Sequence, residues 1–227
     1  MQTNTMANNN RKNDKSTQKK KAGRNTGSLP GEKEAVGLRV ISGRFRGSKL
    51  QYAGDNRVRP MKDRTREAVF NLISTASKGK HVIDLFAGTG ALAIEALSRG
   101  SVSATLIEKH LATMRNLRIN IESLALADCC RLIQADTFYM AHHPEELQAP
   151  PNLPWLVFCS PPYNFYVEKQ TAMIEMLQIL YENAPDESVF VIESDNRFDF
   201  ELLQLSEEND LRRRSYPPAE IGVYRKN

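Results

Sequence analysis

From residue 81 onward, short apolar runs alternate with helix-like segments, and this alternation limits the possible fold more than any other feature of the sequence. The apolar runs lie at 81–86, 104–108, 131–134, 155–159 and 189–193. Helix-like segments lie between most of them, at 91–99, 110–124 and 167–183. Two further short strands, within 211–227 around Pro217-Pro218, have no clear helix between them and indicate an antiparallel pair at a sheet edge. Because alternating strands and helices form parallel sheets with crossover helices, the sequence predicts an α/β fold with a doubly wound, mostly parallel, seven-stranded sheet.

The N-terminal part of the chain has a different character. Residues 1–36 are rich in Asn, Lys, Thr, Gly and Ser, so we expect a disordered basic tail, and they lack the apolar stretch of a secretory signal. Residues 37–52 predict a small β-hairpin around a Gly-rich turn, followed by an Arg/Pro loop. A helix is expected over 63–76, with Asp63 as its N-cap. The predicted organisation is the tail, a basic hairpin and loop extension at 37–66, and an α/β domain at 67–227.

The net charge of +4 is unevenly distributed. Residues 1–66 contain 17 lysines and arginines against 5 acidic residues, whereas residues 67–227 contain 14 against 22. A basic segment joined to an acidic domain suggests that one part of the chain meets a polyanion. A solvated tail that keeps the protein soluble explains the charge equally well.

The cysteines and the apolar runs indicate where the protein works. Cys129 and Cys130 are adjacent, Cys159 is isolated, and none has the spacing of a zinc ligand. This usage is typical of a reduced, intracellular protein, so we expect it in the cytoplasm. No run approaches the roughly 18 apolar residues of a membrane span. We therefore expect no metal and no membrane.

The segment HVIDLFAGTGALAIEALSRG, at 81–100, is the first that suggests a ligand. An apolar strand ends in Asp84, a tight turn contains Gly88 and Gly90, and a helix follows. Glycines at such a turn let the backbone approach a ligand closely, and the helix N-terminus offers amides. A carboxylate at the strand end repels a pyrophosphate but suits a ligand with positive charge, which disfavours a dinucleotide. A Gly-rich turn that serves only packing is the alternative.

Two further acidic residues follow later strands. Glu108 ends the strand ATLIE about twenty residues after the glycine loop, where a nucleoside ribose is bound through its hydroxyls. Asp136, in QADTF, could accept a hydrogen bond from an adenine amine, directly or through its neighbouring backbone. An acid after a strand is also common at surfaces and in turns.

The tetrapeptide Ser160-Pro161-Pro162-Tyr163 directly follows the apolar strand WLVFC. Two successive prolines fix two φ angles and leave their carbonyls free. A side-chain acceptor at 160 and a proline carbonyl could hold an exocyclic NH2, on whose base Tyr163 could stack. Such an amine is a poor nucleophile, so fixed geometry and acceptors on its hydrogens would promote attack. The alternative is a proline loop with a packed tyrosine.

These motifs resemble those of S-adenosylmethionine-dependent amino-methyltransferases. SPPY fits their [Asp/Asn/Ser]-Pro-Pro-[Tyr/Phe/Trp] motif, and VIDLFAGTG fits their cofactor loop. The upstream segment RVISGRFRGSKL…RPMKDRTREAVFNLI resembles the signature of bacterial small-subunit (16S) ribosomal RNA guanine-N2 methyltransferases of the RsmD type, and ALAIEALSRG and TLIEKH continue the match. The resemblance covers roughly 38–227 and implies a Rossmann-like class I methyltransferase fold.

The resemblance also implies site residues. S-adenosylmethionine would be bound by Asp84, Phe86, Gly88, Gly90, Glu108 and Asp136, with Asp84, Gly88 and Gly90 on the methionine side, Glu108 at the ribose and Asp136 at the adenine. The target guanine would be held by the catalytic loop, Ser160, Pro161, Pro162 and Tyr163. Close relatives usually have Asp at the position of Ser160, and a hydroxyl is a weaker, neutral acceptor. This departure puts the rate of methyl transfer in question.

The basic extension would contact the RNA. The candidate residues are Arg44, Arg46, Arg57, Arg59, Arg64 and Arg66, and the Lys-rich tail would add salt-dependent affinity. Intramolecular pairing with the acidic domain is the alternative for these arginines. Because a paired base cannot reach the catalytic loop, the target guanine must be unpaired or flipped out.

The expected protein is a monomeric RNA methyltransferase that acts on free ribosomal RNA or on the small ribosomal subunit. It needs only S-adenosylmethionine and no covalent enzyme intermediate. A DNA adenine-N6 methyltransferase shares the SPPY motif but usually carries a separate target-recognition domain, for which this chain has no spare segment. An RNA-binding or assembly protein that has lost catalysis through Ser160 is the other alternative.

Overall fold

The computed structural model describes residues 37–52, 60–205 and 211–227, so the predicted tail lies outside the described residues. The strands are β1 (His81–Asp84), β2 (Ser103–Ile107), β3 (Cys130–Ile133), β4 (Trp155–Cys159), β5 (Val189–Ser194), β6 (Arg212–Tyr216) and β7 (Ala219–Arg225). The helices are α1 (Asp63–Ile73), α2 (Ala91–Ser98), α3 (Leu111–Ser123), α4 (Thr137–His142), α5 (Phe165–Glu168) and α6 (Gln170–Asn183). Short 3₁₀ turns lie at Ser74–Ser77, Ala127–Cys129, Pro144–Leu147 and Phe200–Leu203.

The strands form one sheet in the order β3-β2-β1-β4-β5-β7-β6. Strands β1 to β5 are parallel, and β7 pairs antiparallel with both β5 and β6. The predicted seven-stranded, mostly parallel sheet with an antiparallel edge is confirmed. The chain leaves β1 toward β2 and β3 in one direction and later toward β4 and β5 in the other, so β1 and β4 flank the point where ligands bind in doubly wound folds.

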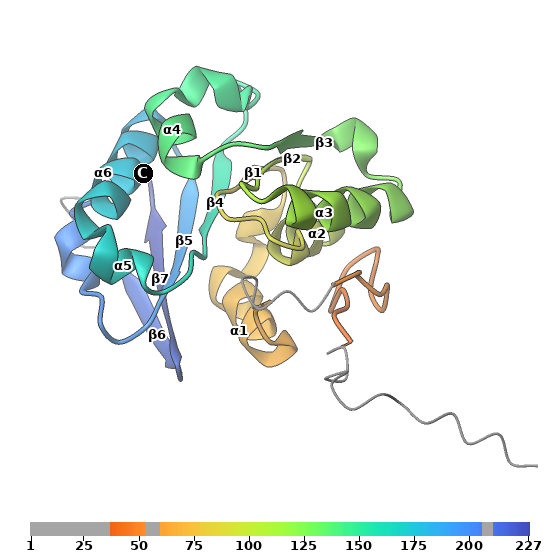
Figure 1. The fold of residues 1–227 in the computed structure, drawn as a ribbon, viewed down its shortest axis with the longest axis horizontal. Coiled ribbons are helices and arrows are strands. Elements are labelled where there is room, and N and C mark those ends of the chain that lie inside the picture. Colours follow the sequence, from red (N-terminus) through yellow and green to blue (C-terminus); the bar gives the residue numbers. More distant parts are fainter. Residues whose placement is uncertain (1–36, 53–59, 206–210) are drawn as a thin grey trace, which may run out of the picture. The chain divides into compact units, whose positions relative to one another are not determined.

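Two hydrophobic clusters cover the two faces of this sheet. Val82 of β1 lies in one cluster with apolar residues of α1, α2 and α3, and its neighbour Ile83 lies in the other with residues of α4 and α6. Successive strand residues point to opposite faces, so alternate side chains of β1 serve the two clusters. The same division is visible in Figure 1, where α2 and α3 lie on one side of the strands and α4 and α6 on the other.

The segment 38–50 forms a small β-hairpin that packs against the end of α2. Its two arms meet at an antiparallel bridge between Arg39 and Lys49, with backbone hydrogen bonds on both sides of the bridge at 2.8 and 2.9 Å. At the start of the turn, the backbone N–H groups of Ile41 and Ser42 donate to the Glu95 carboxylate, at 2.7 and 3.0 Å. The predicted hairpin is therefore confirmed, and it belongs to the same compact unit as the sheet.

Glycine 43 permits this close approach to α2. It has φ +82°, and a Cβ atom there would lie 1.9 Å from the carbonyl oxygen of Ser98. The next two backbone N–H groups, of Arg44 and Phe45, donate to the Ser98 carbonyl and hydroxyl, both at 2.9 Å. Only a glycine fits between the segment and the last residue of α2 in this arrangement.

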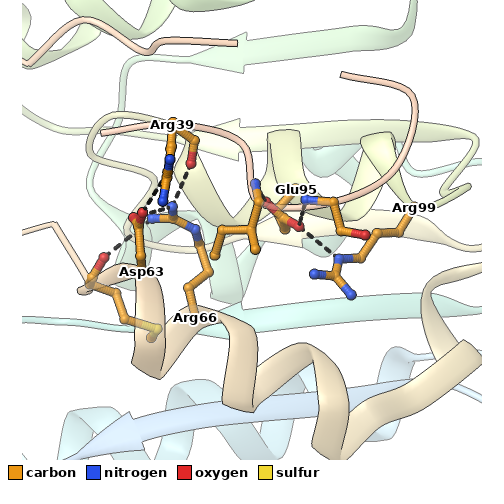
Figure 2. A network of polar contacts seen from close by, with 8 residues as sticks. Arg39, Asp63, Arg66, Glu95 and Arg99 are labelled. Carbon is orange, nitrogen blue, oxygen red and sulfur yellow. Dashed lines mark hydrogen bonds and ion pairs between the residues drawn. The ribbon is translucent and has the colours of Figure 1, made fainter. Parts of the chain in front are cut away.

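Glu95 should be the largest single contributor to this packing. Its side chain is fully buried and also accepts from Arg99 at 2.7 Å, as Figure 2 shows. Replacing Glu95 with alanine removes a buried carboxylate that binds two partly buried N–H groups and Arg99, so we expect the free energy of unfolding to fall by about 3 kcal/mol. Chemical denaturation would measure this loss. Glu67→Ala, an exposed glutamate on α1, is the matched control, and equal stability of the two variants would contradict the assignment.

Three local predictions are wrong. Asp63 is the first residue of α1 and not its N-cap, a position that Lys62 occupies without a side-chain hydrogen bond, because the Asp63 carboxylate pairs with Arg39 and Arg66 instead. The helix expected over 167–183 is divided into α5 and α6. Helix α4, which Asp136 caps, was not expected at all. No helix within the described ranges is long and apolar enough to cross a membrane.

Candidate active site

A cavity of about 660 Å3 lies at the carboxyl ends of the parallel strands. Residues that follow β1, β2, β3 and β4 line it, together with Glu193 near the end of β5 and the turn between β6 and β7. Strand ends of a parallel sheet meet at one edge, so residues far apart in the sequence converge here. The predicted residues that line the cavity are Asp84, Phe86, Gly88, Glu108, Asp136, Ser160, Pro161, Pro162 and Tyr163.

Asp84 ends β1 as a buried carboxylate with spare hydrogen-bonding capacity. Its side chain is 1% exposed, and its Oδ1 atom has no hydrogen-bond partner among the described residues. Burial, with a smaller contribution from the nearby Glu108 carboxylate, raises the pKa of Asp84 from its ordinary 3.8 to about 7. A cationic group in the cavity would satisfy the oxygen and favour the ionised form. The residue therefore fits a positively charged ligand.

Glu108 holds the glycine loop in place. Its Oε2 accepts from the backbone N–H of Gly88 at 3.0 Å, and its Oε1 accepts from that of His110 at 2.7 Å. These bonds tie the loop after β1 to the end of β2. Each carboxylate oxygen keeps a further lone pair, so Glu108 can still accept from a ligand hydroxyl.

Gly90 has a different role from the one expected. It does not line the cavity; it has φ +79° at the start of α2, where a Cβ atom would lie 2.5 Å from Cδ1 of Leu117. Close packing of α2 on α3 therefore accounts for this glycine, which is the packing role that the sequence left open for the turn.

Asp136 and an aromatic group form the wall beyond β3. Asp136 caps α4 by accepting from the Phe138 backbone N–H at 3.0 Å, and it pairs with Lys109 at 2.8 Å. Although partial burial opposes ionisation, these two donors lower the pKa of Asp136 below its ordinary value. Phe86, Phe138 and Phe165 lie next to it with ring centroids 6.0 to 6.4 Å apart. The wall thus offers an aromatic, apolar surface beside one carboxylate, with the Phe86 ring edge-on to the other two.

The SPPY loop directly follows β4 and lines the same cavity. Its Ser160 hydroxyl donates to Oε2 of Glu193, and the Tyr163 hydroxyl donates to Oε1 of the same carboxylate at 2.7 Å. Register explains the meeting, because Cys159 of β4 pairs with Ile192 of β5 and each chain then continues by one residue. The loop is thereby fixed at both its first and last residues.

Comparisons with known proteins agree with this geometry. The model of a protein family described as "Conserved hypothetical protein 95" matches residues 38–225. The chain is 32% identical over 161 residues to the ribosomal RNA small subunit methyltransferase D of Escherichia coli (strain K12), which covers 70% of this chain and 75% of that protein. The chain belongs to this family. The resemblance found in the sequence is therefore confirmed.

Other relatives of this methyltransferase family match over most of the chain. The putative rRNA methyltransferase YlbH of Bacillus subtilis (strain 168) is 27% identical over 193 residues, covering 83% of this chain and 99% of that protein. The solved structure of the putative methyltransferase yhhF from Escherichia coli superposes with a TM-score of 0.66 at 27% identity, covering 84% of this chain and 98% of that one. Fold and family agree with the cofactor expected from the sequence, S-adenosylmethionine.

Glu193 is the acidic cavity residue that the sequence interpretation missed. It is 8% exposed, lines the cavity and binds two residues of the SPPY loop. Its sequence signal is the one that identified Asp84 and Glu108, an acid at the end of an apolar strand, here in VFVIES. Among the described residues, no group of three His, Cys, Asp or Glu side chains could hold a metal ion.

The expected RNA-binding arginines divide into three groups. Arg44, Arg46 and Arg64 are exposed, whereas Arg57 and Arg59 lie outside the described residues. Arg66 is fully buried, and its guanidinium donates to the Arg39 carbonyl at 2.6 Å and to Asp63 at 2.9 Å (Figure 2). An arginine without exposed surface cannot contact phosphates, so the prediction for Arg66 is wrong. Its partners lie within the basic extension and not in the acidic domain that the alternative named.

The exposed arginines lie at different distances from the cavity. Arg64 is on α1, next to Lys62 and Thr65, which line the cavity. The backbone of Arg44 binds the last residue of α2, whereas the cavity is lined by residues of the first turn of that helix. A helix of eight residues is about 12 Å long, so Arg44 lies farther from the cavity. A further exposed run, Arg212-Arg213-Arg214 of β6, was not among the expected residues and leads into the turn at the cavity.

Proposed function

We propose that this protein transfers the methyl group of S-adenosylmethionine to the exocyclic N2 amine of a guanine in small-subunit ribosomal RNA. The observation that carries the proposal is the convergence of two loops on one cavity. The buried Asp84, whose Oδ1 has no partner among the described residues, ends β1, and the SPPY loop follows β4, the neighbouring strand in the sheet. A cation-binding group thus lies next to a loop suited to hold an aromatic amine.

The residues around the glycine loop fit the cofactor. Asp84 would bind the cationic amino group of the methionine moiety, Glu108 the ribose hydroxyls, and Asp136 or its neighbouring backbone the adenine amine. The Phe86, Phe138 and Phe165 rings would lie against the apolar parts of the nucleoside. When bound, S-adenosylmethionine supplies a methyl group activated by its sulfonium centre.

The catalytic loop would position the target amine. Ser160 and a proline carbonyl accept from the two N–H bonds of the NH2 group, and the Tyr163 ring stacks on the base. Pro161 and Pro162 fix the backbone that carries these acceptors. Acceptors aimed at the amine hydrogens favour the geometry in which the nitrogen lone pair faces the methyl group, so the contribution is positioning and electrostatics.

A labelled-methyl assay distinguishes this proposal from its rivals. The protein is incubated with methyl-labelled S-adenosylmethionine and, separately, with small ribosomal subunits, their naked RNA and duplex DNA. We expect label in one or both RNA substrates and none in DNA. Label in DNA would favour an adenine-N6 methyltransferase, and no label in any substrate would favour an assembly protein without activity.

Exposed arginines near the cavity should contribute to RNA affinity without sequence preference. Arg64→Ala combined with Arg214→Ala is expected to weaken RNA binding several-fold and to lower the slope of log affinity against log salt by about 0.7 to 0.9 for each lost phosphate contact. Titrations at several salt concentrations would measure both. Arg131→Ala, at an exposed arginine of the opposite edge strand β3, is the control. An unchanged slope in the double variant would place the RNA elsewhere.

A further inference from the structure

We propose that Glu193 is a positioning residue for the target amine, acting through Ser160. In this arrangement Glu193 supplies the negative charge that a carboxylate at position 160 would carry, and Ser160 transmits it to the amine. The inference rests on the proposed function and deepens it, because it assigns the acceptor of the NH2 group. It also explains how a chain with serine at this position can remain active.

The direction of the hydrogen bonds supports this role. An ionised carboxylate only accepts, so the hydroxyl hydrogens of Ser160 and Tyr163 must both point at Glu193. The lone pairs of the Ser160 oxygen are therefore directed away from Glu193 and remain free to accept an N–H bond. A hydroxyl that donates to a charged group is itself a stronger acceptor, because hydrogen bonds in a chain polarise one another.

The surroundings of Glu193 leave its carboxylate to the two hydroxyls of the loop. The side chain is 8% exposed yet lines the cavity, so little bulk water screens it. No ion pair to Glu193 forms between residues in the described ranges. Its two oxygens are bound by two hydroxyls of the catalytic loop. A cation would neutralise the carboxylate, whereas hydroxyl donors pass part of its charge onward.

Kinetics of four variants test whether Glu193 and Ser160 act as one unit. Glu193→Gln and Ser160→Ala should each lower kcat by about 10 to 100-fold, with little change in the KM for RNA or in cofactor affinity. The double variant should be no more than about threefold slower than either single variant, because both remove the same interaction. Adding Ser160→Asp to Glu193→Gln should restore a large part of kcat, since a carboxylate again faces the amine. Additive losses without this rescue would mean that Glu193 only holds the loop.

Nucleoside binding tests the same claim without methyl transfer. With S-adenosylhomocysteine bound, calorimetry compares guanosine with inosine, which lacks the 2-amino group, and adenosine with purine riboside, which lacks the 6-amino group. We expect about tenfold tighter binding of guanosine than of inosine, and loss of this difference in Glu193→Gln. An affinity difference only within the adenosine pair, and lost in Glu193→Gln, would uphold the role of Glu193 and overturn guanine as the target. A difference within either pair that persists in Glu193→Gln would overturn the role of Glu193. Equal affinity within both pairs in the wild-type protein would overturn the role of Glu193.

Discussion

Replacing Asp84 with asparagine should weaken the binding of S-adenosylmethionine by about 100-fold. Asp84 is buried, and its Oδ1 atom has no partner among the described residues. A cationic amino group bound there forms a charge-assisted pair within a poorly hydrated site, and truncation of such pairs costs about 2 to 5 kcal/mol. Calorimetric titration of the protein with the cofactor would measure the loss. The turnover number at saturating cofactor should change far less than the affinity.

The raised pKa of Asp84 adds a pH dependence with a definite sign. Below about pH 7 the folded, ligand-free protein carries Asp84 protonated, and a cationic ligand must displace that proton. Cofactor affinity should therefore rise with pH, by up to tenfold per pH unit between pH 5 and 7, and then level off. In Asp84→Asn this dependence should be absent. A wild-type affinity that is flat over the same range would contradict the assignment.

The same substitution should stabilise the ligand-free protein at high pH. The folded pKa of about 7 lies above the ordinary 3.8, so the folded state holds a proton that the unfolded state has lost. The free energy of unfolding of the wild-type protein therefore falls as pH rises from about 4 to 7, by up to about 4 kcal/mol. Asparagine carries no charge, so the free energy of unfolding of Asp84→Asn should rise relative to that of the wild type over this range.

Glu95→Gln is the control for cofactor binding. It changes a buried carboxylate that does not line the cavity, so it should not weaken the affinity for the cofactor.

The second large effect concerns the base rather than the cofactor. Tyr163→Ala should lower kcat by about 100-fold and leave cofactor affinity nearly unchanged. The ring lies at the cavity after the two prolines, and stacking of a base on an aromatic side chain is worth about 1 to 3 kcal/mol. Loss of the ring also removes one of the two donors to Glu193. Single-turnover rates with labelled cofactor would separate the methyl-transfer step from binding.

Tyr163→Phe separates the two contributions of this residue. Phenylalanine keeps the ring and loses only the hydroxyl bond to Glu193, so its kcat should fall much less than that of Tyr163→Ala. Equal losses in both variants would assign the effect to the hydroxyl and remove stacking from the account. An equal loss of cofactor affinity and of turnover in Tyr163→Ala would show that the roles of the two loops are wrongly assigned.

The residues at the strand ends could be predicted from the sequence because each is marked by a local signal, an apolar run followed by an acid or by the SPPY loop. Apolar runs predict where the strands lie, each acid or loop follows one of them, and the resemblance to methyltransferases implies that Asp84, Glu108, Asp136 and Ser160 share one site. Glu193 carries the same signal, yet its importance depends on register. Only the pairing of Cys159 with Ile192 shows that the residues that follow them, Ser160 and Glu193, lie side by side.

The error at Arg66 comes from a tertiary contact that the sequence does not display. Arg66 lies in a basic segment typical of RNA binding, but α1 places its side chain in the interior, where Asp63 and two backbone carbonyls bind it. One of those carbonyls belongs to Arg39, 27 residues away. The hairpin at 38–50 was expected, but no local pattern shows that its Ile41 and Ser42 N–H groups bind Glu95 on α2.

The identity of the methylated nucleoside tests the central claim most directly. Small-subunit ribosomal RNA that lacks the modification is treated with the protein and labelled S-adenosylmethionine, digested to nucleosides and compared with authentic standards by mass spectrometry. The account predicts N2-methylguanosine as the labelled product, at a level that falls sharply with Tyr163→Ala. Labelled N6-methyladenosine, or a product whose yield is unaffected by changes at the SPPY loop, would contradict it.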